Sequence, residues 1–420
     1  MRGRRLSRTC SRLSAFILAL LLMVSSQVAY VSEPDAFSEV MPYDVLCGPE
    51  PPQFAQVSSE LQVGSSDTAL DRAYELILAG RLVETLDLLD SAGYTEGANP
   101  RADYYRVLAL CGTKRLDDAV ELVQSLFEDQ AYAGLAHYAL GCAYLNQSGL
   151  YDSSSPASAL AQFEKAWNLL PDASGLAFYL GLTHYELGEY ARAAEMLEVA
   201  VERDESLAQG YLNLGFALAR LGETQAALDA LHNAAQLGHD HRQACMAIGD
   251  LYFELGDFEA AASCYKVVSD EGFLSAQYKL SLALLLSGEV EEAKAVAEEL
   301  VSAYPKHFDG WITLGRARQA LGEIEGAIEA FESALWLRPG HFSVRLHLAS
   351  ACLAASEIDR AKSYVEEALD IYGGDAVAYR LLAEILEAQG DMDGAREAVR
   401  KSVQIDPSDA LARSLYERLI

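Results

Sequence analysis

The sequence lacks the motifs on which most enzyme active sites depend. It contains no serine or cysteine nucleophile motif, no glycine-rich loop that could cradle a phosphate, and no His-Glu-x-x-His zinc motif. Its seven cysteines are widely and irregularly spaced and include no Cys-x-x-Cys pair. We therefore expect no catalytic residue, no bound metal and no cofactor, and we predict that the protein is not an enzyme.

Basic side chains are also scarce. The chain has 32 Lys and Arg against 62 Asp and Glu, a formal net charge of −30, and five of the arginines precede position 13. The remainder is therefore still more acidic, so it should repel nucleic acid and anionic lipid and attract basic partners. The plainer interpretation is that the acidic side chains keep a surface rich in Ala and Leu soluble.

Proline and strand-like alternation are absent from long stretches, which is typical of stacked helices. Helix breaks recur there instead, at steps of 34, 34, 32, 34, 34 and 34 residues. Glycine suits a left-handed residue that closes one helix, and the acid after it favours the N-terminus of the next. One helix pair cannot bury its own apolar face, so this period predicts a solenoid of stacked pairs. The breaks are Gly188-Glu189, Gly222-Glu223, Gly256-Asp257, Gly288-Glu289, Gly322-Glu323, Ser356-Glu357 (the one substitute for glycine) and Gly390-Asp391.

The residues between the breaks carry a family resemblance. The stretch 308–341 has Trp311, Leu314, Gly315, Ala327, Phe331, Ala334 and Pro339 in the order and spacing of a tetratricopeptide repeat, with Arg318 in place of its tyrosine. The chain thus resembles the tetratricopeptide-repeat family, with about ten tandem repeats over residues 66–410 and a slight Sel1-like character near residues 234–252. The resemblance implies an all-α, right-handed superhelical solenoid of antiparallel helix pairs that binds proteins or peptides.

The pattern divides the chain into segments. Residues 66–133 read as two degenerate repeats, and residues 134–407 as the regular array, with an insertion at 146–156 whose Ser, Gly and Asp residues cannot continue a helix. Residues 408–420 begin with Ser408 and resemble the solvating helix that covers a last repeat. Residues 32–65 hold five prolines without helical period and read as a linker.

Residues 1–31 have the pattern of an export signal. Arginines precede an apolar run from Leu13 to Val24, and small residues follow at Ser25 and Ser26. Cleavage after about Ser26 would release the array outside the cytoplasm. Alternatively, the apolar stretch extends through Val31, which is just enough for a retained single-pass anchor. In both cases we expect an exported protein that touches the membrane only through this segment.

Two further groups of residues admit a structural and a functional interpretation. Cys245 and Cys352 replace packing residues of first helices, so buried thiols are expected, with a Cys245–Cys264 bridge as the alternative. The stretch 238–245 contains His239, Asp240, His241 and Cys245, which could be drawn as a metal site. It falls at a junction between repeats, where polar residues cap helices and fill turns.

The family resemblance implies that a partner binds the concave face, on first-helix positions that do not pack against the second helix. This face reads as apolar over several repeats and turns polar beyond Ile312. It could hold a peptide or an amphipathic helix, or it could be buried where tight curvature packs neighbouring repeats together. The candidate partner-binding residues are Tyr138, Phe178, Leu182, Tyr185, Leu212, Phe216, Met246, Phe253, Tyr278, Leu282, Ile312 and Arg316.

The sequence therefore predicts a non-catalytic interaction scaffold of the cell envelope that binds a protein or peptide partner. One alternative is a structural protein in which the apolar face mediates self-association. Another is a non-catalytic subunit of an envelope enzyme or transporter. The sequence does not name the partner, because groove positions indicate only a class of ligand.

Overall fold

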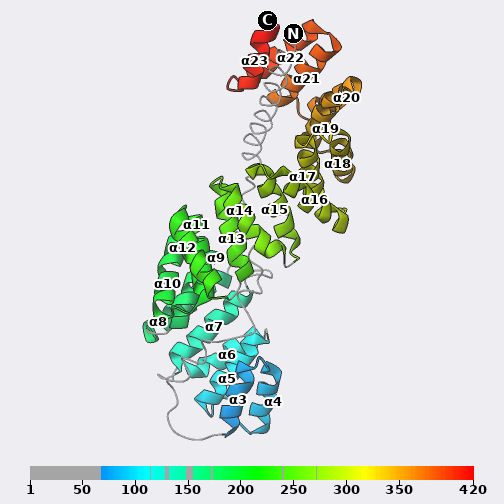
Figure 1. Cartoon of the computed structure of the whole chain (residues 1–420). Helices are drawn as coiled ribbons and strands as arrows, with labels where there is room; N and C mark the ends of the chain where they lie inside the picture. The colour runs from blue at the N-terminus through cyan, green and yellow to red at the C-terminus, as the bar shows by residue number, and fades with distance from the viewer. Residues whose placement is uncertain are drawn as a thin grey trace. The chain divides into compact units, whose positions relative to one another are not determined.

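The computed structural model describes residues 68–113, 115–127, 132–147, 155–171, 174–238, 241–270 and 272–420. The described part is all helical and holds 21 helices. They fall into two compact units, with the boundary inside α13, between Leu251 and Tyr252. Within each unit the helices follow one another as stacked pairs (Figure 1).

The N-terminal unit contains five helix pairs and most of α13. The pairs are α3 (Thr68–Leu78) with α4 (Leu82–Ser91), α5 (Pro100–Gly112) with α6 (Leu116–Leu126), α7 (Ala133–Gln147) with α8 (Ser155–Leu169), α9 (Ser174–Glu186) with α10 (Tyr190–Arg203), and α11 (Ala208–Arg220) with α12 (Thr224–Gln236), followed by α13 (His241–Glu254). The predicted insertion falls between α7 and α8, and residues 148–154 of it lie outside the described residues.

The C-terminal unit begins at the end of α13 and closes with an unpaired helix. Its helices are α14 (Phe258–Ser269), α15 (Leu274–Ser287) with α16 (Val290–Ala303), α17 (Phe308–Ala320) with α18 (Ile324–Leu337), α19 (Phe342–Ala354) with α20 (Ile358–Ile371), α21 (Ala376–Gln389) with α22 (Met392–Ile405), and α23 (Ala410–Leu419). Nine helix pairs, the successive helices α13 and α14, and a final helix agree with the repeat number that the sequence predicts.

The glycines of the periodic breaks have the expected left-handed backbone. Their φ angles lie between 75° at Gly188 and 95° at Gly288. Ser356 occupies the same position with φ 63°, and it is the one non-glycine residue with positive φ in the described part. The left-handed turn is therefore kept at Ser356, although serine is unfavourable in that conformation, because the packing of α19 against α20 determines the turn.

The acids after the breaks differ in what they do. Asp257 and Asp391 cap α14 and α22, since their carboxylates accept hydrogen bonds from Ala260 N at 3.1 Å and Gly394 N at 2.9 Å. The glutamates at the other breaks make no such cap, as for Glu323 before α18. Aspartate reaches the first-turn N–H groups, whereas the longer glutamate side chain offers its charge alone to the helix N-terminus.

A second glycine position explains how the two helices of a repeat approach closely. A Cβ added at Gly315 would lie 2.5 Å from the Phe331 ring, and one at Gly215 would lie 2.5 Å from Cγ of Leu231. Phe331 and Leu231 are fully buried. The large side chain of the second helix thus fills the space that the missing Cβ of the first helix leaves.

The sequence predicted a capping helix at the C-terminal end and an export segment with a linker at the N-terminal end. The final helix is present, but its cap is Asp409 rather than the expected Ser408. Asp409 accepts hydrogen bonds from Leu411 N and Ala412 N, while Ser408 donates to Asp406. The predicted export segment (1–31) and linker (32–65) lie outside the described residues, and no helix of the described part is long and apolar enough to cross a membrane.

Candidate partner-binding surfaces

The predicted apolar face is buried in most of the N-terminal unit. Five of its side chains are only between 1% and 6% exposed, and they are core residues: Tyr138, Phe178, Leu182, Leu212 and Phe216. Tyr138, for example, packs edge-on against Tyr179, with ring centroids 5.6 Å apart. Of the two alternatives for this face, an exposed groove or burial between neighbouring repeats, these five positions have the second, because adjacent first helices contact each other.

The remaining seven candidates keep part of their surface exposed. They are Tyr185, Met246, Phe253, Tyr278, Leu282, Ile312 and Arg316. The Tyr185 ring packs edge-on against Tyr190, and the Phe253 ring packs edge-on against Phe258. In each case the partner is the first residue of the following helix. Four of the seven candidates belong to α15 and α17 of the C-terminal unit, and these two first helices are in direct contact. We call the group Tyr278, Leu282, Ile312 and Arg316 the first-helix face.

Arg316 gives this face its distinctive electrostatics. Its guanidinium has neither an ion-pair nor a hydrogen-bond partner in the described part of the chain, and burial lowers its pKa. The charge of Arg316 contributes to the pKa shifts of both Tyr278 and His347, which lie nearby. Burial raises the pKa of Tyr278 to about 12 and lowers that of His347 to about 3, so both are neutral at pH 7. Arg316 therefore has no ion-pair partner in the described part of the chain, and the carboxylate of Asp309 is close enough to act on Tyr278.

Two imidazole nitrogens also lack partners, one on His347 beside Arg316 and one on the neighbouring His341. His347 Nε2 and His341 Nδ1 are buried without a hydrogen bond, and they are two of three such side-chain atoms in the described residues. His347 stacks on the Phe331 ring with centroids 5.1 Å apart, and His341 packs on Phe308 at 4.8 Å. Buried polar atoms are normally satisfied, so unpaired groups concentrated in one place indicate room for an additional polar group.

Further along the C-terminal unit the polar residues are already paired. Arg380 is buried and bonds to Glu384 and Asp409, at 3.2 Å each. Glu387 pairs with Arg418 of α23 at 2.7 Å. Gln319 donates to the Ser350 hydroxyl at 3.2 Å. Arg380 and Glu387 thus connect α21 to α23, and Gln319 connects α17 to α19, whereas Arg316 contributes no such bond.

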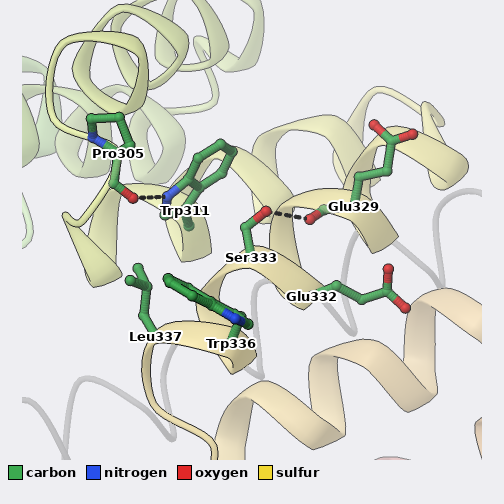
Figure 2. Close-up of a pocket in the computed structure, with 7 residues that line it drawn as sticks. All are labelled: Pro305, Trp311, Glu329, Glu332, Ser333, Trp336 and Leu337. Carbon is green, nitrogen blue, oxygen red and sulfur yellow. Dashed lines mark hydrogen bonds between the residues drawn. The ribbon is translucent and has the colours of Figure 1, made fainter.

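A cleft lies on the other side of the same repeat, against its second helix. It has a volume of about 520 Å³ and is lined by Pro305, Trp311, Glu329, Glu332, Ser333, Trp336 and Leu337. Figure 2 shows the indoles of Trp311 and Trp336 on opposite sides of the cleft, with the two glutamates extending from one end. We call this the tryptophan cleft.

Trp336 is a candidate binding residue that the sequence prediction did not include. It is 78% exposed, more than any other large apolar side chain of the described residues. Its position in the repeat holds a polar residue in neighbouring repeats, which was a signal available from the period alone. The equivalent residues are Glu202, Gln236, Asp270, Ser302, Asp370 and Gln404, and all of them are exposed.

The cysteine and histidine candidates that the structure describes lie within helices. Cys245 and Cys352 are buried, as expected for first-helix packing positions. Cys245 Sγ lies 3.4 Å from Nε2 of His241 on the preceding turn. His239 and Asp240 lie outside the described residues, and within the described part no three potential ligands come together to hold a metal.

Comparison with known protein families identifies the repeats. The tetratricopeptide-repeat model matches residues 138–210, 180–241, 212–272, 246–308 and 312–376, and a second model of the same description matches residues 353–419. These matches cover well over half of the sequence. The chain therefore belongs to the tetratricopeptide-repeat family, as the periodic breaks and the Trp-Leu-Gly pattern predicted.

Several solved tetratricopeptide-repeat structures are similar to parts of the chain. A tetratricopeptide-repeat protein from Parabacteroides merdae is 18% identical, with a TM-score of 0.46, over 59% of this chain and 98% of its own. A thermophilic one from Thermus thermophilus is 23% identical, with a TM-score of 0.37, over 42% and 98%. YrrB, described as having an unusual peptide-binding site, is 19% identical, with a TM-score of 0.40, over 44% and 96%. No curated protein matches the sequence.

Family membership establishes a general level of function. Tetratricopeptide repeats typically mediate protein–protein interactions, and their scaffold is generally non-catalytic. No catalytic family matches any part of the chain.

Proposed function

We propose that this protein is a non-catalytic scaffold that holds a segment of a protein partner on the first-helix face of its C-terminal unit. The observation that carries the proposal is the unpartnered Arg316 between partly exposed apolar side chains. A segment bound there would place apolar side chains on Leu282 and Ile312 and an acidic group on Arg316. An amphipathic helix satisfies both requirements on one of its faces.

The neutral groups around Arg316 favour such an acidic contact. An unpaired guanidinium costs free energy when it is surrounded by protein, and a carboxylate from a partner would remove that cost. Tyr278 and His347 cannot supply the missing charge, since the pKa shifts keep both of them uncharged at pH 7. The site therefore favours an acidic group of the partner, although the chain as a whole is strongly acidic.

We further propose that the scaffold works in the cell envelope, as an exported protein whose residues 1–31 are either a cleaved signal or a retained anchor. The support is the arginine-rich start followed by the apolar run from Leu13. Sequencing the N-terminus of the mature protein distinguishes the two forms. An intact N-terminus together with protease resistance of the array in cells whose outer barrier has been opened would contradict export.

Site-specific photocrosslinking in intact cells tests the partner site. A photoreactive residue at Leu282 should give one dominant adduct, which mass spectrometry can identify. The matched control is Glu325, which is exposed on the second helix α18 and lies outside both the first-helix face and the tryptophan cleft. Equal adducts at both positions, or none at Leu282, would contradict the proposal. A dominant adduct with a second copy of the chain would instead support self-association.

A further inference from the structure

The tryptophan cleft is built on a departure from the repeat pattern. Six equivalent positions in other repeats hold polar, exposed residues, so an outward polar side chain is what this helix position favours. Trp336 replaces it with the largest apolar side chain and leaves 78% of that side chain exposed. An indole in water gains nothing for the fold, and exposed tryptophan is typical of residues that become buried against a partner.

The cleft places acidic groups beside this indole. Glu329, Glu332, Ser333 and Trp336 have the spacing i, i+3, i+4 and i+7, so they share one side of α18. The opposite wall is Trp311, whose indole Nε1 donates to the carbonyl oxygen of Pro305 at 2.8 Å. That bond fixes the ring orientation. The cleft is therefore rigid on one side and open at Trp336 on the other (Figure 2).

The two glutamates are not equivalent. Glu332 already accepts hydrogen bonds from Arg360 at 2.6 Å and from the Tyr364 hydroxyl at 3.3 Å. The Glu329 carboxylate has no ion-pair or hydrogen-bond partner in the described part of the chain; only its backbone carbonyl is used, by Ser333. Nearby Arg338 is also engaged elsewhere, over the Phe308 ring at 4.2 Å. One carboxylate beside the exposed indole is therefore available for a cation from outside.

The chain itself shows which cation suits a tryptophan on a second helix. Trp167, on α8 of the N-terminal unit, has the Arg203 guanidinium over its ring at 4.9 Å, and Arg203 also donates to the Pro171 carbonyl at 2.8 Å. No cation of the described residues covers Trp336 in this way. Trp167 of the N-terminal unit is thus covered by an arginine, whereas Trp336 of the C-terminal unit has no such cation among the described residues.

We propose that the tryptophan cleft binds an arginine-bearing peptide segment of a protein partner. The guanidinium would stack on the Trp336 ring and pair with Glu329, and the aliphatic stem would lie against Trp311 and Leu337. Arginine fits better than lysine, because its planar guanidinium can stack and donate to a carboxylate at once. The net charge of −30 steers a basic segment toward this surface. This site goes beyond the proposed function, since it lies against the second helix and prefers the opposite charge.

The test titrates the full-length protein with a capped peptide of alternating Arg and Gly, monitored by isothermal titration calorimetry. The same peptide with citrulline in place of arginine keeps the shape and loses the charge. We expect Trp336→Gln to weaken binding by about tenfold or more, and Glu329→Gln to weaken it by roughly threefold to tenfold. Trp336→Gln restores a residue that equivalent repeats carry at positions 236 and 404, so the fold should tolerate it.

Asp370→Asn is the matched control, because Asp370 is the exposed acid at the equivalent position of the next repeat. It should leave peptide affinity unchanged, and added salt should weaken binding to the unmodified protein. Equal affinity for the citrulline peptide, or unchanged affinity of Trp336→Gln, would overturn the proposal. Sedimentation at rising protein concentration adds a further check. If Trp336→Gln abolishes self-association, the occupant is a second copy of the chain and the choice of a separate partner is wrong.

Discussion

The two units share one repeat pattern but differ in how far equivalent first-helix positions are buried. In the N-terminal unit, the first-helix positions expected to face a partner hold aromatic and aliphatic side chains that pack into the core, such as Phe178 and Phe216. In the C-terminal unit, the corresponding positions leave Leu282 and Ile312 partly exposed around Arg316. Equivalent position in a repeat therefore does not decide exposure. What decides it is how closely adjacent first helices approach and how well their side chains fill the space between them.

Truncating one side chain in each unit is the largest test of this difference. Phe216→Ala should cost about 3–5 kcal/mol of unfolding free energy, since it opens a cavity in a packed core. Leu282→Ala removes a partly exposed side chain and should cost roughly 1 kcal/mol. Hydrogen exchange resolved by peptide reports the two units separately. Similar losses in both would mean that the first-helix face is as closed in α15 as in α11.

Acid should destabilise the C-terminal unit through His347. Burial, together with the positive charge of Arg316 and the neighbouring His341, lowers the pKa of His347 to about 3. In the unfolded chain His347 is protonated below about pH 6.5, whereas in the folded chain it stays neutral down to about pH 3. The free energy of unfolding therefore decreases as the pH falls from about 6.5 toward 3. The expected loss across that window is a few kcal/mol.

His347→Gln is the variant that isolates this effect, because glutamine cannot take up the proton. Its exchange rates in α17 to α19 should depend less on pH than those of the unmodified chain. An unchanged pH dependence would assign the acid sensitivity to carboxylates whose pKa the fold lowers, such as Asp406, which accepts a hydrogen bond from the Ser408 hydroxyl.

Filling the glycine position of the helix crossing should have a smaller effect that differs between the units. In Gly315→Ala the new Cβ meets the rigid Phe331 ring, and in Gly215→Ala it meets the flexible branch of Leu231. We expect a loss of about 1–3 kcal/mol at Gly315 and a smaller one at Gly215. Gly340→Ala is the control, because nothing lies within 4 Å of its Cβ position. Thermal unfolding gives the order, and a greater loss at Gly215 would contradict this account.

The smallest effect should come from the break that lacks glycine. Ser356→Gly should stabilise the C-terminal unit by about 1 kcal/mol, since glycine adopts positive φ without the Cβ clash. The reverse change Gly222→Ser in the N-terminal unit should destabilise it by a similar amount. Denaturant midpoints of both variants test this. A destabilised Ser356→Gly would show that the Ser356 side chain makes a contribution larger than its backbone strain.

The tetratricopeptide-repeat fold was predictable because its signals are local. Gly188 and Gly222 are left-handed where the period placed them, and Gly315 marks the close approach to Phe331. Details that depend on side-chain reach were not predictable in the same way. Ser408 looked like a cap, yet Asp409 makes the cap bonds. Trp336 carried a readable signal, but that signal emerges only when each repeat is aligned with the others.

By itself the sequence determined the helix pairs, their number, their turns and the acidic character of the chain, since each depends on residues near one another along the chain. Only the tertiary structure decided which faces remain exposed. The contacts between successive first helices buried Tyr138 and Phe216 and left Arg316 unpaired, and the packing of Trp311 beside α18 opened the cleft at Trp336. Exposure and charge pairing depend on neighbours about 34 residues away, and no local pattern records how closely those neighbours pack.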